Sequence, residues 1–294
     1  MLDDTPYRRI LVYSGIILIS AMFLLPLLGT VDLFDAEETK YAESAREMIV
    51  TGDYLDVQID FKPLAENPPL FYWLQVLSMK LFGINELGAR FPNVICGMIS
   101  LMLLYSLGRQ IYGHRFGLLW ILSFGAAILP FFFFRSGIID PWFNLFMFTG
   151  IALSIFYLDP DRRKKRLRNL VLSSLFLGLA VLTKGPVALL IYLLTLLAFL
   201  ALRRFRISTT AGHVGLFVLV FALVGGSWFM IQAARGNSWM IRELFAYQAR
   251  LLTTGSTVHD GFFGYHLVVL LMGVFPASVI LLKCITKKSE TTEL

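Results

Sequence analysis

Long apolar runs alternate with short polar segments along almost the whole chain. A helical run of roughly 18 residues crosses a hydrocarbon core of ~30 Å at ~1.5 Å per residue. Runs near or slightly below this length cover residues 10–28, 91–107, 116–134, 141–158, 170–182, 186–202, 214–234 and 265–282. The pattern predicts an all-α polytopic membrane protein with about eight transmembrane helices. The fifth run is short and lies against Lys184-Gly185-Pro186, so runs five and six are either two spans or one broken, re-entrant element.

The segment between the first two runs, residues 29–89, has a different periodicity. Within residues 37–50, apolar side chains recur at helical spacing, with carboxylates opposite them, at Tyr41, Ala45, Met48 and Ile49. This spacing predicts an amphipathic helix on the membrane surface, which Thr51-Gly52-Asp53-Tyr54 ends. The charged residues of the helix are expected to form a solvated face with local ion pairs, and they are Glu43, Arg46 and Glu47.

A second juxtamembrane helix is predicted from about Pro68 to Phe82. Asn67-Pro68-Pro69 gives it a rigid start. Its aromatic residues suit the headgroup interface, and they are Phe71, Tyr72 and Trp73. The sequence therefore predicts one transmembrane module over residues 1–288, with two short helices in the external loop 29–89, and a polar cytoplasmic tail at 289–294.

Composition and charge agree with a membrane protein. Hydrophobic residues make up 57% of the chain, charged residues 16%, and mean hydropathy is +0.70. Lys and Arg gather on one side of the predicted topology, in clusters at 8–9, 109–115, 162–168, 203–206 and 283–288. Because short basic loops stay cytoplasmic, both termini are predicted to be cytoplasmic and the location to be the cell inner membrane. The net charge of +6 then reflects topology and does not indicate nucleic-acid binding.

The other side of the predicted membrane collects the polar residues suited to chemistry. The external loop 29–89 has eleven acidic residues against four basic ones. Candidates from the whole chain fall on this side, and they are Asp35, Glu37, Glu38, Glu66, Arg135, Asp140, Lys184, Arg235, Arg250 and His259. A carboxylate accepts the proton of an attacking hydroxyl, while Lys and Arg neutralise a departing phosphate. These residue types predict sugar transfer from a lipid-phosphate donor by a single displacement that inverts the anomeric centre. The chain contains no nucleotide-binding glycine loop, so no nucleotide cofactor is expected.

Five motifs follow one another over nearly the whole chain. They are Asp35-Ala36-Glu37-Glu38-Thr39-Lys40-Tyr41-Ala42-Glu43 with Ala45-Arg46-Glu47-Met48, Glu66-Asn67-Pro68-Pro69-Leu70-Phe71-Tyr72-Trp73, Ile139-Asp140-Pro141, Thr183-Lys184-Gly185, and Phe245-Ala246-Tyr247-Gln248-Ala249-Arg250. Together they resemble bacterial C-type glycosyltransferases related to protein O-mannosyltransferases and to the lipid A aminoarabinose transferase. The resemblance implies a GT-C fold, a polyprenyl-phosphate-linked sugar as donor, and a lipid, glycan or protein acceptor on the periplasmic side.

The resemblance also implies a role for each matching position. The catalytic carboxylate of the family falls on Glu37, with Glu38 at the next acidic position, and Asp140 matches a second functional carboxylate. Lys184 matches a phosphate-contacting lysine, and Arg250 is a weaker candidate for the same duty. Glu37 stands where the family usually has Asp, which moves the base by about a bond length.

Other positions concern a metal, a missing cation and the length of the chain. Glu66 and His259 fall where similar relatives bind a divalent metal outside the reaction centre. Asn67 stands where many relatives have Lys, so Lys62 or Arg235 is expected to supply the phosphate-binding cation. Relatives continue into further spans and a globular external domain, whereas this chain ends at Leu294. A short family member, one half of a split protein and a truncated gene product are all open readings.

Several of these assignments have structural alternatives. Asp140 is suited to be an N-cap before Pro141, Lys184 to be a snorkelling interface lysine, and His259 to be an ordinary loop residue. The predicted function is a membrane glycosyltransferase with Glu37 as the base. The rival is a non-catalytic polyprenyl-phosphate-sugar binder or flippase-like partner, or one half of a split transferase.

Overall fold

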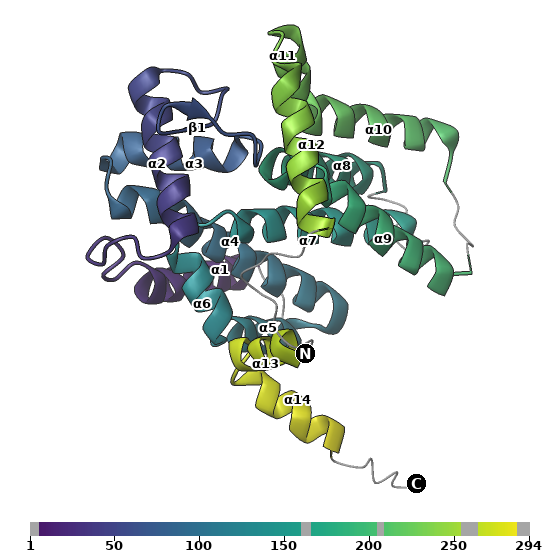
Figure 1. The fold of residues 1–294 in the computed structure, drawn as a ribbon. Helices are drawn as coiled ribbons and strands as arrows, with labels where there is room; N and C mark the ends of the chain where they lie inside the picture. The colour runs from purple at the N-terminus through teal and green to yellow at the C-terminus, as the bar shows by residue number, and fades with distance from the viewer. Residues whose placement is uncertain (1–5, 160–165, 205–208, 254–263, 287–294) are drawn as a thin grey trace, which may run out of the picture.

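The structure is a computed structural model that describes residues 6–159, 166–204, 209–253 and 264–286. The described chain is a bundle of helices (Figure 1). The helices are α1 (Pro6–Leu24), α2 (Ala36–Thr51), α3 (Leu70–Phe82), α4 (Glu86–Tyr112), α5 (His114–Gly125), α6 (Ile128–Arg135), α7 (Asp140–Leu158), α8 (Arg166–Lys184), α9 (Val187–Leu202), α10 (Ala211–Gly225), α11 (Ser227–Ala234), α12 (Ser238–Thr253), α13 (Gly264–Gly273) and α14 (Ala277–Thr286). An antiparallel hairpin of strands β1 (Gln58–Ile59) and β2 (Lys62–Pro63) lies between α2 and α3. The predicted all-α fold is confirmed, with this short hairpin as an unpredicted addition.

The predicted apolar runs are helical over most of their lengths, but some of them are bent. Helices α4, α7 and α8 are each long and apolar enough to cross a membrane. Helices α5 and α6 meet at 70°, and α10 and α11 at 57°, so each pair is a broken span or a re-entrant loop. Up to five spans therefore pass by length and composition within the described ranges. The total of about eight stays a prediction.

The turn at Lys184-Gly185-Pro186 joins two separate helices. Helix α8 has 19 residues, more than the sequence predicted, and ends at Lys184. Gly185 then adopts a left-handed φ of +74°, which glycine reaches without a steric penalty, and α9 follows. Helix α8 is long enough to cross a membrane by itself, whereas α9 has only 16 residues, so whether α9 is a second span stays a prediction.

Glycines let the central helices approach one another closely. A Cβ atom at Gly150 of α7 would lie 2.7 Å from Leu177 Cγ of α8. A Cβ atom at Gly178 of α8 would lie 2.9 Å from the backbone nitrogen of Gly225 of α10. Small residues at such contacts allow the van der Waals packing that holds membrane helices together. The close contact of α7 with α8 also brings the start of α7 near the end of α8.

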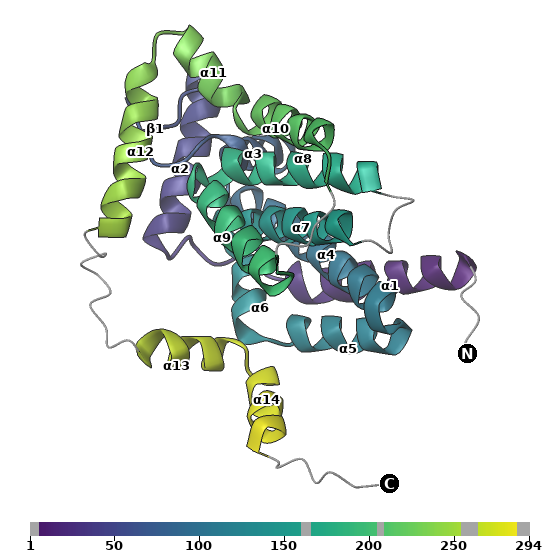
Figure 2. The same ribbon diagram turned by 90° about the vertical axis from the view of Figure 1, so that its right-hand side faces the viewer.

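Helices α2 and α12 lie at the same end of the bundle (Figure 2). Helix α2 starts after Asp35, whose carboxylate accepts the N–H of Glu37 at 3.3 Å, and ends at Gly52 with φ +74°. The predicted boundaries of α2 are confirmed to within a residue: Gly52 belongs to the predicted end of the helix, whereas the capping role of Asp35 was not predicted. Helix α3 begins directly after Pro69, also as predicted.

The inner faces of α2 and α3 form a small core together. Phe71 and Tyr72 are fully buried, and Tyr41 meets their rings at centroid distances of 5.5 and 5.7 Å. The prediction that these two α3 aromatics lie at the headgroup interface is wrong, because the packing of α3 against α2 covers them. Glu47 is also buried and accepts the N–H of Phe61 at 2.9 Å, so its predicted solvated position is wrong. The predicted surface ion pair is confirmed, because a terminal guanidinium nitrogen of Arg46 lies 2.6 Å from Glu43 Oε1.

Candidate active site

The first half of the site is a lysine held between two carboxylates. Lys40 Nζ lies 2.7 Å from Glu66 Oε2 and 3.7 Å from Glu37 Oε1. The spacing of Glu37 and Lys40, three residues apart on α2, places them on one helix face. The Glu37 side chain is 55% exposed, whereas those of Lys40 and Glu66 are 21% and 22% exposed. Glu37 is therefore the carboxylate of this group that is open to an incoming molecule.

Two tyrosines surround this group. The Tyr41 hydroxyl donates to Glu37 Oε2 at 2.9 Å, and burial, together with the neighbouring Tyr72 and Glu37, raises the pKa of Tyr41. Burial and the charge of Glu66 raise the pKa of Tyr247 on α12. Both phenols therefore stay protonated and remain hydrogen-bond donors at neutral pH.

Lys40 stays charged in this setting. Burial acts to lower the pKa of Lys40, but the hydrogen bond that Lys40 donates to Glu66 and the charges of Glu66 and Glu37 outweigh it, so the pKa is raised. The nearby carboxylates thus keep an ammonium at the centre of the group. Lys40 was not predicted to belong to the site, and Tyr41 was predicted only as an apolar residue of the amphipathic helix, although their i+3 and i+4 positions relative to Glu37 were a usable signal.

The second half of the site is an ion pair between the start of α7 and the end of α8. Lys184 Nζ lies 2.7 Å from Asp140 Oδ1, with the two side chains 27% and 34% exposed. The ammonium also lies 5.5 Å from the centroid of the Phe143 ring. Asp140 is the first residue of α7, with Ile139 at the cap position and Pro141 next to it. Asp140 therefore pairs with Lys184 instead of acting as the N-cap, and Lys184 has a defined partner.

The two halves face each other through α2 and α12. The charge of Asp140 is one of those that act on Tyr41, and Gln248 of α12 donates to the Lys184 carbonyl at 3.4 Å. The two halves together contain three carboxylates and two ammonium groups, and both halves lie near Tyr41 and α12. The carboxylates are Glu37, Glu66 and Asp140, and the ammonium groups are Lys40 and Lys184. Such a site can take a phosphate between its lysines while leaving a carboxylate free for proton transfer.

Glu38, which was predicted as a catalytic carboxylate, has a different environment. Its side chain is fully buried, and both of its oxygens accept from Arg90, at 2.8 and 2.9 Å. Oε1 also accepts the N–H of Gly137. Both oxygens are therefore occupied inside the protein, and Glu38 does not reach the open space in front of Glu37.

The remaining predicted cations have partners or lie apart. Arg250 pairs with Glu243 at 2.6 Å on the exposed side of α12, while its charge still acts on Tyr247. Arg235 is held by Asp53 and Asp56 at 3.3 and 3.1 Å. Lys62 lies exposed on β2, and no contact joins it to the site within the described part of the chain. Its predicted phosphate contact stays a prediction.

The predicted metal pair is only half described. His259 lies outside the described residues. Glu66 Oε2 is engaged by the Lys40 ammonium at 2.7 Å, a contact that competes with a cation. Within the residues that the structure describes, no group of three or more His, Cys, Asp or Glu side chains forms a metal cage. The described residues therefore do not fit a metal by themselves, and the metal stays a prediction.

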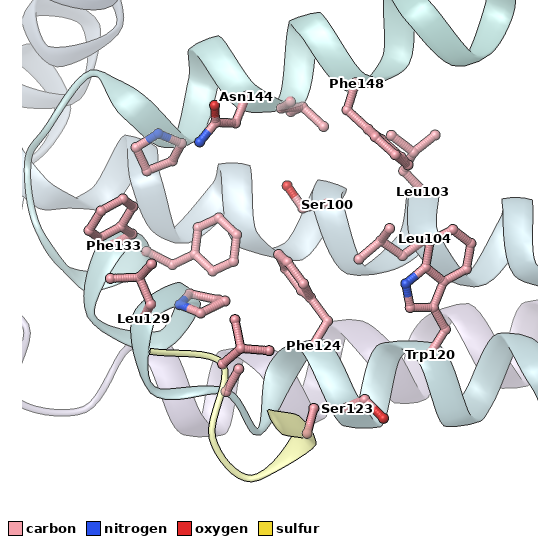
Figure 3. A pocket seen from close by; sticks show the side chains of 17 residues that line it. Ser100, Leu103, Leu104, Trp120, Ser123, Phe124, Leu129, Phe133, Asn144 and Phe148 are labelled. Carbon is pink, nitrogen blue, oxygen red and sulfur yellow. The ribbon is translucent and has the colours of Figure 1, made fainter. Parts of the chain in front are cut away.

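An apolar cavity of about 580 Å³ lies between α4, α5, α6 and α7 (Figure 3). Its walls are mostly aromatic and aliphatic, with Ser100, Ser123 and Asn144 as polar members. Pro141 lines it and directly follows Asp140, and Asn144 lies one turn further along α7. The cavity therefore starts within one helical turn of the Asp140–Lys184 pair. Of the four consecutive phenylalanines at 131–134, Phe133 and Phe134 line the cavity, whereas Phe132 is exposed.

Comparison with known proteins places this arrangement in a family context. The family described as "Dolichyl-phosphate-mannose-protein mannosyltransferase" matches residues 66–229. The "Undecaprenyl phosphate-alpha-4-amino-4-deoxy-L-arabinose arabinosyl transferase" of Photorhabdus laumondii is 26% identical over 260 residues, which are 86% of this chain and 46% of that protein. A homologous transferase of Proteus mirabilis is 26% identical over 271 residues, covering 89% of this chain and 48% of its own.

Solved structures show the same fold. The crystal structure of ArnT from Cupriavidus metallidurans bound to undecaprenyl phosphate superposes with a TM-score of 0.76, at 22% identity, over 96% of this chain and 51% of that one. The same protein in the apo state gives a TM-score of 0.77. The fold and the apolar helices identify a multi-pass membrane protein. The chain spans about half the length of the curated relatives and of the solved structures it matches.

Proposed function

We propose that this chain, which belongs to the dolichyl-phosphate-mannose-protein mannosyltransferase family, transfers a sugar from a polyprenyl-phosphate donor to a lipid A-like, glycan or protein acceptor. The observation that carries the proposal is an exposed carboxylate, Glu37, beside Lys40 on α2, together with Lys184 at the end of α8, where it pairs with Asp140 of α7. A phosphate leaving group requires such cations, and an attacking hydroxyl requires such a base. Similar proteins bear names that include undecaprenyl phosphate, which supports a long-chain donor.

The reaction is a single displacement at the anomeric carbon. The acceptor oxygen forms a bond to that carbon as the bond to the phosphate oxygen breaks, and the configuration inverts. Glu37 takes the proton of the acceptor hydroxyl, and the Tyr41 hydroxyl holds its other oxygen in place. Lys184, with Lys40 beside Glu37, neutralises the polyprenyl phosphate that leaves. Asp140 orients Lys184 and leaves an oxygen for a sugar or acceptor hydroxyl.

The apolar cavity is the proposed site for the first part of the donor chain. Pro141 lines the cavity and directly follows Asp140, so a lipid whose phosphate meets Lys184 would have the start of its chain beside the cavity. Contact of the first isoprene units with the walls of the cavity would fix the direction of the donor chain. The membrane is proposed to be the cell inner membrane, with the charged site on the periplasmic side and both termini in the cytoplasm, because the topology predicted from the sequence puts the basic clusters on the side opposite the site.

The test is sugar transfer by the purified chain in proteoliposomes, with a radiolabelled polyprenyl-phosphate sugar and a lipid acceptor. Loss of the base is expected to slow transfer by roughly 100-fold or more in Glu37→Gln. The matched control is Glu43→Gln, the same change on the same helix at a surface ion pair, and it is expected to stay within about twofold of the unaltered chain. Equal losses in both variants would overturn the assignment of Glu37. Donor binding without transfer by the unaltered chain would favour the lipid-phosphate binder or the half of a split enzyme.

A further inference from the structure

A second charged cluster lies behind the site and does not face open space. It consists of Glu38 of α2, Arg90 and Asn93 of α4, Gln75 of α3 and Gly137 before α7, and is called here the Arg90 cluster. Arg90 is 3% exposed and Glu38 is fully buried. An isolated charge in such a position is strongly destabilising, so each of these two groups depends on the other.

Arg90 uses its entire set of N–H donors. Besides its two bonds to Glu38, it donates to three backbone carbonyls of the segment that leads into α2. These carbonyls belong to Leu28 at 3.0 Å, Val31 at 2.6 Å and Asp32 at 3.0 Å. A guanidinium has five donors in a rigid fork. The bonds therefore fix both the approach of the chain to α2 and the rotation of the first turn of α2, where Glu37 lies.

The same cluster fixes the segment that leads into α7. Glu38 accepts the N–H of Gly137. Asn93 donates to the carbonyls of Ser136 and Ile138, and Gln75 donates to the carbonyl of Gly137 at 3.3 Å. Three consecutive residues are thus held by side chains from α2, α3 and α4, and Asp140 follows two residues later.

We infer that Arg90 and Glu38 are positioning residues for sugar transfer. Their buried ion pair fixes both the start of α2, where Glu37 lies, and the segment that leads to Asp140, and it thereby sets the separation between these two carboxylates. The inference rests on the proposed function, in which these two carboxylates act on one substrate complex. A displacement of ~1 Å between reacting groups lowers a rate by about 100-fold. A lysine at position 90 keeps the charge but cannot reproduce the five-donor fork.

The test compares Arg90→Lys and Glu38→Gln with two controls. Arg46→Lys makes the same change in a two-bond Arg–Glu pair at the surface of α2. Tyr105→Ala opens a cavity in α4, far along the helix from Arg90, and controls for a general loss of stability. Each variant is measured in nanodiscs for kcat and donor KM, and for hydrogen exchange of peptides covering residues 28–38 and 136–142.

The positioning role predicts a specific combination of results. Arg90→Lys and Glu38→Gln are expected to lower kcat by about 30- to 100-fold, to change donor KM by less than about threefold, and to speed exchange in those two peptides only. Unchanged kcat with faster exchange would overturn the inference, as would an equal fall of kcat in Tyr105→Ala at matched thermal stability. If the unaltered chain transfers no sugar, the proposed function fails separately. The hydrogen-exchange data then test the positioning by the Arg90 cluster on their own. If the peptide covering residues 136–142 stays protected from exchange in Glu38→Gln, the inference is overturned.

Discussion

The pairing of Lys184 with Asp140 leads to an unusual prediction for Asp140→Asn. In the structure the carboxylate holds the ammonium at 2.7 Å, so an arriving donor phosphate competes with Asp140 for Lys184. Removing the negative charge frees the lysine. Asp140→Asn is therefore expected to bind polyprenyl phosphate more tightly while transferring sugar more slowly.

The size of the expected gain in polyprenyl-phosphate affinity follows from the solvent exposure of the Asp140–Lys184 ion pair. With side chains 27% and 34% exposed, the ion pair is worth about 1 kcal/mol, at the upper end for solvent-accessible pairs. A free-energy change of about 1 kcal/mol is roughly fivefold in Kd. Lys184→Gln removes a charge-assisted contact of about 1.5–3 kcal/mol and is expected to weaken binding by roughly 10- to 100-fold. In the Lys184→Gln background the Asp140→Asn gain should disappear, because the competition no longer exists.

The assay is equilibrium binding of radiolabelled polyprenyl phosphate to the four members of this double-mutant cycle in nanodiscs. Asp53→Asn serves as the control, since it makes the same change in the ion pair with Arg235, and its Kd is expected to match that of the unaltered chain. Weaker binding by Asp140→Asn would refute the reasoning. So would a fivefold gain that persists without Lys184.

Three further predictions use other parts of the site. Tyr41→Phe removes the hydroxyl that holds Glu37 at 2.9 Å, and kcat is expected to fall by about tenfold, with donor Kd, measured by the same binding assay, unchanged. Lys40 has a raised pKa, so the stability that its ion pair with Glu66 contributes is complete below the ordinary lysine pKa of 10.5 and is lost only as pH rises through the higher pKa of the folded state. The difference in Tm between the unaltered chain and Lys40→Met should therefore stay constant from pH 7 to about pH 9.5 and shrink above it. A difference that vanishes near neutral pH would contradict this prediction. Ser100→Phe fills part of the apolar cavity and is expected to raise KM by about tenfold for a long polyprenyl donor but not for a donor with a two-isoprene chain, in steady-state transfer assays.

Much of the fold was predictable because a membrane helix is visible in the sequence as an apolar run of sufficient length. The ends of α2 were predictable too, since Asp35 and Gly52 cap it by local chemistry. The bends of α5 against α6 and of α10 against α11 were not, because a bend depends on how neighbouring helices pack and leaves the apolar run unbroken. Phe71 and Tyr72 were misplaced for a related reason: an aromatic run suits an interface and a core equally well.

The residue types of the candidate site were visible in the sequence, but their pairing was not. Glu37, Glu66, Asp140 and Lys184 were all singled out; the structure joins the first two through Lys40 and pairs the last two with each other, and their roles stay predictions. Glu37 and Glu38 are adjacent acids in the sequence, yet one is open and the other is buried against Arg90, 52 residues away. Only the rotation of α2 against α4 separates their roles, and that rotation is a tertiary property. Lys40 was overlooked because a lysine among acids on a helix usually belongs to a solvated face.

The anomeric configuration of the product is the most direct test of an inverting single displacement with Glu37 as the base. The unaltered chain in nanodiscs would be supplied with a polyprenyl-phosphate sugar of known anomeric configuration, and the purified product examined by NMR. A product with the inverted configuration, absent when Glu37 is replaced by Gln, is the predicted result. A product that retains the donor's configuration would contradict the single displacement assigned to Glu37, and the absence of any product would contradict transfer by this chain.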